Sequence, residues 1–202
     1  MSANFVHLSV HSEFSMRDGI VRVADLIKNA ADLKMPTVAL TDRSNLFATV
    51  KLYTKALKAG LKPLVAAELY LFDADNEKQP ISTISAFCLN KTGYKHLTEL
   101  VSTAYLQGQG PGQPTITWSQ LVEKNAGLLI LSGGCYGNIG QALLANDKAH
   151  AEKLLQQWQT VFQDRFYIEL QRTQRPNEED YLHAVLPYAE KYQIPVDRKS
   201  VV

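Results

Sequence analysis

The chain has 202 residues, 46% hydrophobic and 20% charged, a balance typical of a globular protein with a sizeable core that excludes a disordered or fibrous chain. Because 21 Lys and Arg residues nearly cancel 20 Asp and Glu residues, no overall positive field is present to hold DNA, and a free-standing DNA-binding protein is not indicated. The sequence has no apolar run of about 18 residues and no signal-peptide pattern, so we expect a cytoplasmic protein without membrane contact.

Strand and helix patterns alternate from the beginning of the chain. The run "FVHLSV" predicts a short first strand, and "PTVALTD" predicts a buried strand that ends on Asp42. Apolar residues at helical spacing predict helices over residues 20–35 and 44–60. We expect the second helix to end at Gly60. One face of this second helix contains Leu46, Val50, Tyr53 and Leu57.

The same alternation continues through the rest of the chain. Residues 107–117 are dense in Gly, Pro and Gln and predict a mobile surface loop. Strands are predicted over residues 62–72, 84–90, 128–134, 165–172 and 194–196, and helices over residues 92–108, 118–127, 138–163 and 177–193. Strands separated by helices of this length favour an α/β fold with a mainly parallel sheet, either open or closed into a barrel.

In such a sheet, reactive groups collect where the C-terminal ends of the strands meet the following loops. The polar residues at these ends are Ser9, His11, Asp42, Arg43, Glu68, Ser132 to Cys135 and Glu169 to Arg172. Cys88 and Cys135 are far apart and outside any Cys-x-x-Cys pattern, so neither a disulfide framework nor a zinc knuckle is indicated. We expect Cys88 to be a small core residue.

Several ordered segments carry a resemblance to a known family. They are "FVHLSVHSEFSMRDG", "TVALTDRSNLFATVKLYTKALKAGLKPLVAAELYL", "NKTGYKHLTELVSTAY", "LLILSGG" and "FYIELQRT". Together they resemble the PHP domain, named after polymerases and histidinol phosphatases, as it occurs at the N-terminus of the alpha subunit of bacterial replicative DNA polymerase III. We assign residues 1–196 to this domain and expect residues 197–202 to be a non-native or truncated tail. The resemblance implies a distorted (β/α)7-type barrel of mainly parallel strands, which we expect to lack its last strand here.

Active members of this family carry a cluster of two or three divalent ions that hydrolyses phosphoesters by activating water. The resemblance implies that three of their ligand positions are lost in this sequence. Ser9 stands at the first His of a His-x-His motif, Arg43 at the His of Thr-Asp-His, and Thr83 at a His that begins the fourth strand. The closing Asp-x-His pair would lie beyond Val196. A multinuclear site is therefore not expected.

The ligand candidates left are vestigial: His11, Asp18, Glu68 and Cys135. A catalytic ion takes about three protein ligands and an open position, and a pair of ions takes more. Arg43 repels a divalent cation and can pair with a leftover carboxylate. We predict a salt bridge from Arg43 to Asp18 or Glu68 in place of the metal. No cofactor is expected in this fragment beyond residual Zn or Mn.

His7 lies on the same face of the predicted first strand as Ser9 and His11. At about 3.3 Å per residue, a regular strand separates His7 from His11 by roughly 13 Å. Two nitrogens on one ion lie only about 3 Å apart. We therefore expect His7 to be a hydrogen-bonded packing residue and not a ligand.

Three functions from different classes compete. The resemblance implies the PHP portion of a replicative DNA-directed DNA polymerase, a nucleotidyltransferase whose Mg-dependent site lies further along a longer chain that also contacts the DNA. This portion would be catalytically degenerate and would dock the proofreading exonuclease (epsilon) subunit within the polymerase III holoenzyme. The alternatives are a metal-dependent phosphoesterase or 3'-5' exonuclease using the PHP site, and a free-standing enzyme similar to histidinol phosphatase. The abrupt polar ending "DRKSVV" argues against the last.

Overall fold

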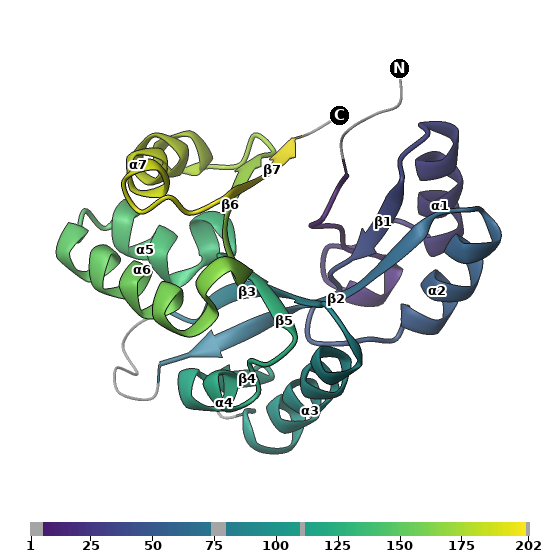
Figure 1. Ribbon diagram of the computed structural model, residues 1–202, viewed down its shortest axis with the longest axis horizontal. Coiled ribbons are helices and arrows are strands. Elements are labelled where there is room, and N and C mark those ends of the chain that lie inside the picture. Colours follow the sequence, from purple (N-terminus) through teal and green to yellow (C-terminus); the bar gives the residue numbers. More distant parts are fainter. Residues whose placement is uncertain (1–5, 74–79, 110–111, 201–202) are drawn as a thin grey trace. The chain divides into compact units, whose positions relative to one another are not determined.

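The computed structural model describes residues 6–73, 80–109 and 112–200 (Figure 1). The chain divides into two compact units, unit 1 over residues 1–68 and unit 2 over residues 69–202. The boundary falls within β2 (Lys62–Phe72), a strand of eleven residues whose first part belongs to unit 1 and whose last part belongs to unit 2. In the part of the chain that the structure describes, no helix is both long and apolar enough to cross a bilayer.

Unit 1 combines two helices with two parallel strands. Its elements are η1 (Glu13–Ser15), α1 (Val23–Asp32), β1 (Thr37–Leu40), α2 (Thr49–Lys58) and the first part of β2. The parallel register of β1 and β2 places Thr37 opposite Lys62 and Leu40 opposite Val65. Each helix turns one apolar face inward, which produces a single core. This core contains Val23, Ile27, Ala30, Val38, Leu40, Ala48, Leu52, Ala56 and Leu61.

The predicted first strand is not present as a regular strand. Phe5 lies outside the described residues, and residues 6–10 form no strand ladder. Thr41 N donates to Val10 O at 2.8 Å, but Val10 N donates in return to the Thr41 hydroxyl at 3.0 Å. Because a side chain replaces the backbone acceptor, the segment is attached to the end of β1 without extending the sheet.

The helix predicted over residues 44–60 is α2, and the face that the sequence pattern selects points outward. Val50, Tyr53 and Leu57 are 75%, 50% and 54% exposed. The buried residues of α2 are Leu52 and Ala56. The pattern was misleading because small alanines, which contribute little to an apolar stripe, provide the close packing of this helix against the rest of unit 1.

Unit 2 contains the remaining elements in alternating order (Figure 1). Its strands after β2 are β3 (Ser82–Cys88), β4 (Thr115–Thr117), β5 (Leu128–Leu131), β6 (Phe166–Arg172) and β7 (Val196–Ser200). Its helices are α3 (Lys91–Gln107), α4 (Trp118–Glu123), η2 (Gly134–Tyr136), α5 (Asn138–Leu144), α6 (Lys148–Phe162), η3 (Gln163–Arg165) and α7 (Glu178–Lys191). The predicted α/β class with mainly parallel strands is confirmed.

Most strand pairs of unit 2 are parallel. β2 pairs with β4, β5 with β6, and β6 with β7 in this sense, whereas β3 and β5 are antiparallel. β4 lies within the stretch predicted as a loop, because the β-branched run "TIT" outweighs the Gly and Pro residues before it. Asp197 to Ser200, assigned from the sequence to a tail, pair with Glu169 to Arg172. The non-native or truncated origin of residues 197–202 stays a prediction.

Candidate functional site

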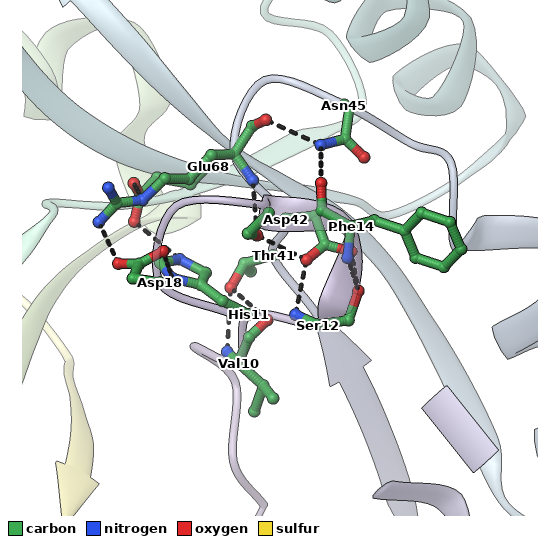
Figure 2. Close-up of polar contacts among 11 residues, drawn as sticks. Val10, His11, Ser12, Phe14, Asp18, Thr41, Asp42, Asn45 and Glu68 are labelled. Carbon is green, nitrogen blue, oxygen red and sulfur yellow. Dashed lines mark hydrogen bonds and ion pairs between the residues drawn. The ribbon is translucent and has the colours of Figure 1, made fainter. Parts of the chain in front are cut away.

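The candidate site of unit 1 consists of four side chains from four separate segments (Figure 2). His11 precedes η1, and Asp18 lies in the connection from η1 to α1. Arg43 follows β1, and Glu68 lies in β2. An isolated parallel bridge pairs Arg43 with Glu68, which places their side chains next to one another. The C-terminal end of β1 thus positions the site, as expected for a parallel α/β arrangement.

These four residues form a closed set of contacts, which we call the charge ring. Arg43 Nη2 lies 2.9 Å from Asp18 Oδ2, and Arg43 Nε lies 3.0 Å from Glu68 Oε1. His11 Nδ1 lies 3.4 Å from Asp18 Oδ1, and His11 Nε2 lies 3.1 Å from Glu68 Oε2. Each carboxylate therefore uses one oxygen for the guanidinium and the other for the imidazole. The predicted salt bridge of Arg43 is present to both carboxylates.

The charge ring does not fit a divalent metal ion. An ion bound by Asp18 and Glu68 would need oxygens that already contact Arg43, whose guanidinium is permanently charged. Displacing that guanidinium would leave its positive charge close to the metal ion. Among residues 6–73, 80–109 and 112–200, no group of three or more His, Cys, Asp and Glu side chains is arranged to hold a metal ion.

Asp42, which directly precedes Arg43, is held by a separate set of hydrogen bonds (Figure 2). Its carboxylate is buried and accepts from Ser12 N at 2.6 Å, Ser12 Oγ at 2.6 Å and Ser15 Oγ at 2.7 Å. Three short hydrogen bonds satisfy this carboxylate without a metal. Asp42 was predicted from its place at a strand end. Ser12 and Ser15 were not, although their spacing in "HSEFS" around a short helical turn was the available signal.

The other predicted positions are not gathered into the charge ring. Ser9 is buried and lies in the segment before His11, and His11 rather than His7 supplies the imidazole. Thr83 and Cys135 belong to unit 2, in β3 and η2. The candidate set His11, Asp18, Glu68 and Cys135 is thus divided, with three members in the charge ring of unit 1.

Within unit 2, Thr83 and Cys135 are associated with one turn, residues 132–137. Gly133 has a φ of +76°, and a Cβ on it would lie 2.0 Å from Thr83 O, so glycine is required there. Burial raises the pKa of the Cys135 thiol, and the negative charge of Glu178 raises this pKa further. The thiol stays protonated at neutral pH, whereas a cysteine nucleophile must be a thiolate.

The carboxylates beyond this turn also have structural partners. Glu169 Oε1 accepts from Gln171 Nε2 at 2.7 Å, and Glu169 N donates to Ser132 Oγ at 3.0 Å. Buried Glu178 accepts from Thr173 N and Oγ1 and from Arg175 N, and so fixes the chain before α7. The predicted residues Glu169 to Arg172 thus lie within β6 itself, and Glu178, which was not predicted, fixes the start of α7.

Comparisons with known proteins identify related sequences and folds. A sequence model of the PHP domain matches residues 7–173. DNA polymerase III subunit alpha of Pseudomonas aeruginosa is 44% identical over 97% of this chain and 17% of that protein. The same subunit of Escherichia coli is 42% identical over 95% of this chain and 16% of that protein. The chain thus spans about a sixth of the length of these relatives.

Two solved structures have a similar fold. One is a putative metal-dependent phosphoesterase from Bifidobacterium adolescentis, with a TM-score of 0.62, 14% identity and coverage of 98% of this chain and 87% of that one. The other is an amidohydrolase from Chromobacterium violaceum with bound sulfate and no metal, with a TM-score of 0.63, 14% identity and coverage of 96% and 86%. At this identity the two structures establish the fold alone.

Proposed function

Because the chain belongs to the PHP domain family, we propose that it is the PHP portion of a replicative DNA polymerase III alpha subunit in which the family's metal chemistry has been lost. Its role in this proposal is structural: it stabilises the polymerase and docks the proofreading exonuclease subunit of the holoenzyme. The Mg-dependent nucleotidyl transfer and the contacts to DNA belong to the parent chain, in the cytoplasm. The support is the sequence similarity to polymerase subunits and the composition of the charge ring.

The contacts of Arg43 are the main support for the proposed loss of metal chemistry. Its guanidinium contacts both carboxylates that would bind an ion, at 2.9 and 3.0 Å. The four side chains of the charge ring are only 12–25% exposed, so water screens these contacts weakly. Arg43 Nε and Glu68 Oε1 do not meet hydrogen-bond geometry, so their contact acts through the attraction between the two charges. The same charge therefore neutralises the carboxylates and excludes a divalent cation.

A metal-dependent phosphoesterase or 3'-5' exonuclease is the second candidate function. Its support is the fold shared with a putative metal-dependent phosphoesterase. A phosphoesterase of this class needs ions that activate water and stabilise the charge on the phosphoryl oxygens. The charge ring leaves no carboxylate oxygen without a cationic or imidazole contact, so this candidate is the weaker one.

Metal content and hydrolysis separate the two candidates. We expect protein purified without added metal to contain far less than one equivalent of Zn or Mn by plasma mass spectrometry. We also expect it not to hydrolyse nitrophenyl phosphate above background. Replacing Ser9 and Arg43 with His should raise the metal content, because Arg43→His removes the excluding charge and both substitutions add imidazole ligands.

The matched control is Arg172→His, which removes a guanidinium from an exposed ion pair with Glu179 and should leave the metal content unchanged. Stoichiometric metal together with phosphatase activity in the unmodified protein would establish the phosphoesterase. For the docking role, the proofreading exonuclease subunit should bind the unmodified chain in a calorimetric titration, and failure to bind contradicts this role.

A further inference from the structure

Four large apolar side chains are exposed in a row, which we call the α2 stripe: Phe47 from the turn before α2, and Val50, Tyr53 and Leu57 from the outer face of α2. Their exposed fractions are 69%, 75%, 50% and 54%. The spacing of Val50, Tyr53 and Leu57 by three and four residues places these three along one face of α2, and Phe47 comes three residues before Val50. Single exposed apolar residues are common, but a contiguous row of them on a protein surface is typical of an interaction site.

Lysines border the α2 stripe along one side. Lys51 and Lys58 lie next to it at helical spacing, with Lys55 one step further around the helix. α2 contains no acidic residue. Lys51 pairs with Glu13 at 3.2 Å, whereas Lys55 and Lys58 form no ion pair within the described residues. Three lysines at mutual spacings of three and four residues repel one another, and a negatively charged partner would relieve this repulsion.

We infer that the outer face of α2 is a docking surface for an amphipathic helix of a partner protein that carries acidic residues along one flank of its apolar face. Such a helix would lay its apolar residues on the α2 stripe and its carboxylates against Lys55 and Lys58. This is the recurring mode in which an amphipathic helix is recognised through residues spaced by three, four and seven positions. The inference deepens the docking role proposed above and rests on it.

Two other occupants fit the charges less well. A second copy of this chain, placed antiparallel by a two-fold axis with its own α2 stripe on this one, would bring one lysine border toward the other. An anionic membrane surface would suit lysines on both sides of an apolar stripe, whereas here they follow one side. A helix with a single acidic flank matches this asymmetry.

The direct test is a titration of the full 202-residue chain with designed helical peptides. The probe has about 18 residues, with Leu at helical spacing and Glu along one flank. A second peptide carries Lys in place of Glu. We expect the acidic peptide to bind at least about tenfold more tightly than the basic one, as measured by fluorescence anisotropy. Amide shifts in the ¹⁵N spectrum should map to α2.

Two double variants separate the apolar from the charged part of the surface. V50S/L57S should lower the affinity for the acidic peptide by about tenfold or more, because this variant lacks two large contact side chains. K55E/K58E should reverse the preference, so that the basic peptide binds more tightly. The matched controls are I20S/L106S, which removes exposed apolar side chains elsewhere, and K148E/K153E, which reverses two charges on α6. Both should bind like the unmodified chain.

Equal affinity for the acidic and basic peptides, or no effect of V50S/L57S, overturns the inference. Binding to phosphatidylserine vesicles that depends on Val50 and Leu57, without peptide binding, assigns the surface to a membrane. Self-association that V50S/L57S abolishes assigns it to a second copy. Should V50S/L57S fail to fold by circular dichroism, the reversal by K55E/K58E decides alone.

The exonuclease subunit provides a separate readout. If it binds the unmodified chain and V50S/L57S equally, the docking role stands and α2 is not the surface for it. If it binds neither, the docking role fails, and the peptide titration still decides whether α2 recognises an acidic amphipathic helix.

Discussion

The charge ring of unit 1 and the 132–137 turn of unit 2 both hold residues at positions where active relatives are expected to bind metal, and they differ in how they are stabilised. In the charge ring, three ionisable candidates are retained, and Arg43 supplies the positive charge. At the turn, Cys135 is a protonated thiol, and the neutral Thr83 of β3 packs its backbone closely against Gly133.

Under the proposed loss of the metal site, this difference corresponds to two ways of replacing a metal ion. Carboxylates that stay in a partly buried place need a counter-charge, because burying an unpaired charge is costly. Where a ligand position holds a small neutral residue such as Thr83, the fold needs only shape complementarity and satisfied hydrogen bonds. Substitutions in the charge ring should therefore change stability through unbalanced charge, and substitutions in the 132–137 turn should change it through steric clashes.

Removing the guanidinium of the charge ring should have the largest effect. In Arg43→Ala, Asp18 and Glu68 lose their common cation, and we expect the free energy of unfolding to fall by about 3 kcal/mol, the range for breaking a buried pair. Urea denaturation followed by circular dichroism measures this loss. Arg172→Ala, which breaks an exposed pair with Glu179, is the control and should change stability little. Equal stability of the two variants would mean that the charge ring is not needed to balance the carboxylates.

Adding one methyl group to the turn should have the next largest effect on the free energy of unfolding. Gly133 and Gly60 both have a φ of +76°, but a Cβ on Gly133 would meet Thr83 O at 2.0 Å, whereas Gly60 has nothing within 4 Å. Gly60→Ala should cost about 1 kcal/mol, from the left-handed backbone alone. Gly133→Ala should cost about 2 to 3 kcal/mol, because the backbone must also move. Equal losses in thermal denaturation would show that space at the turn is not limiting.

Changing the charge of Asp42 should have an intermediate effect. In Asp42→Asn, an amide NH₂ replaces an oxygen that accepts from Ser12 Oγ, and one buried hydroxyl loses its acceptor. We expect a loss of about 2 kcal/mol, within the range for hydrogen bonds to charged groups. Asp164→Asn on the exposed turn of η3 is the matched control. A loss no greater than that of Asp164→Asn in urea denaturation would assign the stabilisation of this segment to contacts other than the Asp42 carboxylate.

Much of the fold could be predicted from the sequence, because it follows from the alternation of short buried strands and amphipathic helices. The alternation gave the α/β class and nearly all helices and strands. It failed at residues 6–10, where the Thr41 hydroxyl takes the place of a ladder acceptor, a tertiary detail that no periodicity contains. It also misplaced the inner face of α2, because alanines such as Ala56 make the close contacts there.

The candidate site was predictable where charge decides and not where backbone geometry decides. An arginine at a ligand position beside two leftover carboxylates predicts an ion pair, and Arg43 contacts both Asp18 and Glu68. Whether one or both carboxylates are reached depends on the bridge between the residue after β1 and β2, which the sequence does not specify. The serines that hold Asp42 were missed because serine is common in turns, so their spacing in "HSEFS" is only a weak signal.

The smallest effect concerns the reactivity of the thiol in the turn. Because burial and the charge of Glu178 raise the pKa of Cys135, its thiolate fraction at pH 9 should stay below that of an unfolded cysteine, and alkylation by iodoacetamide should be correspondingly slow. The measurement uses Cys88→Ser, since Cys88, whose pKa burial raises to about 12, would otherwise add a second slow thiol. The same variant in urea gives the unfolded rate. A native rate at pH 9 equal to the unfolded rate would mean that the turn opens readily, and the close packing around Gly133 could then not be what replaces a ligand there.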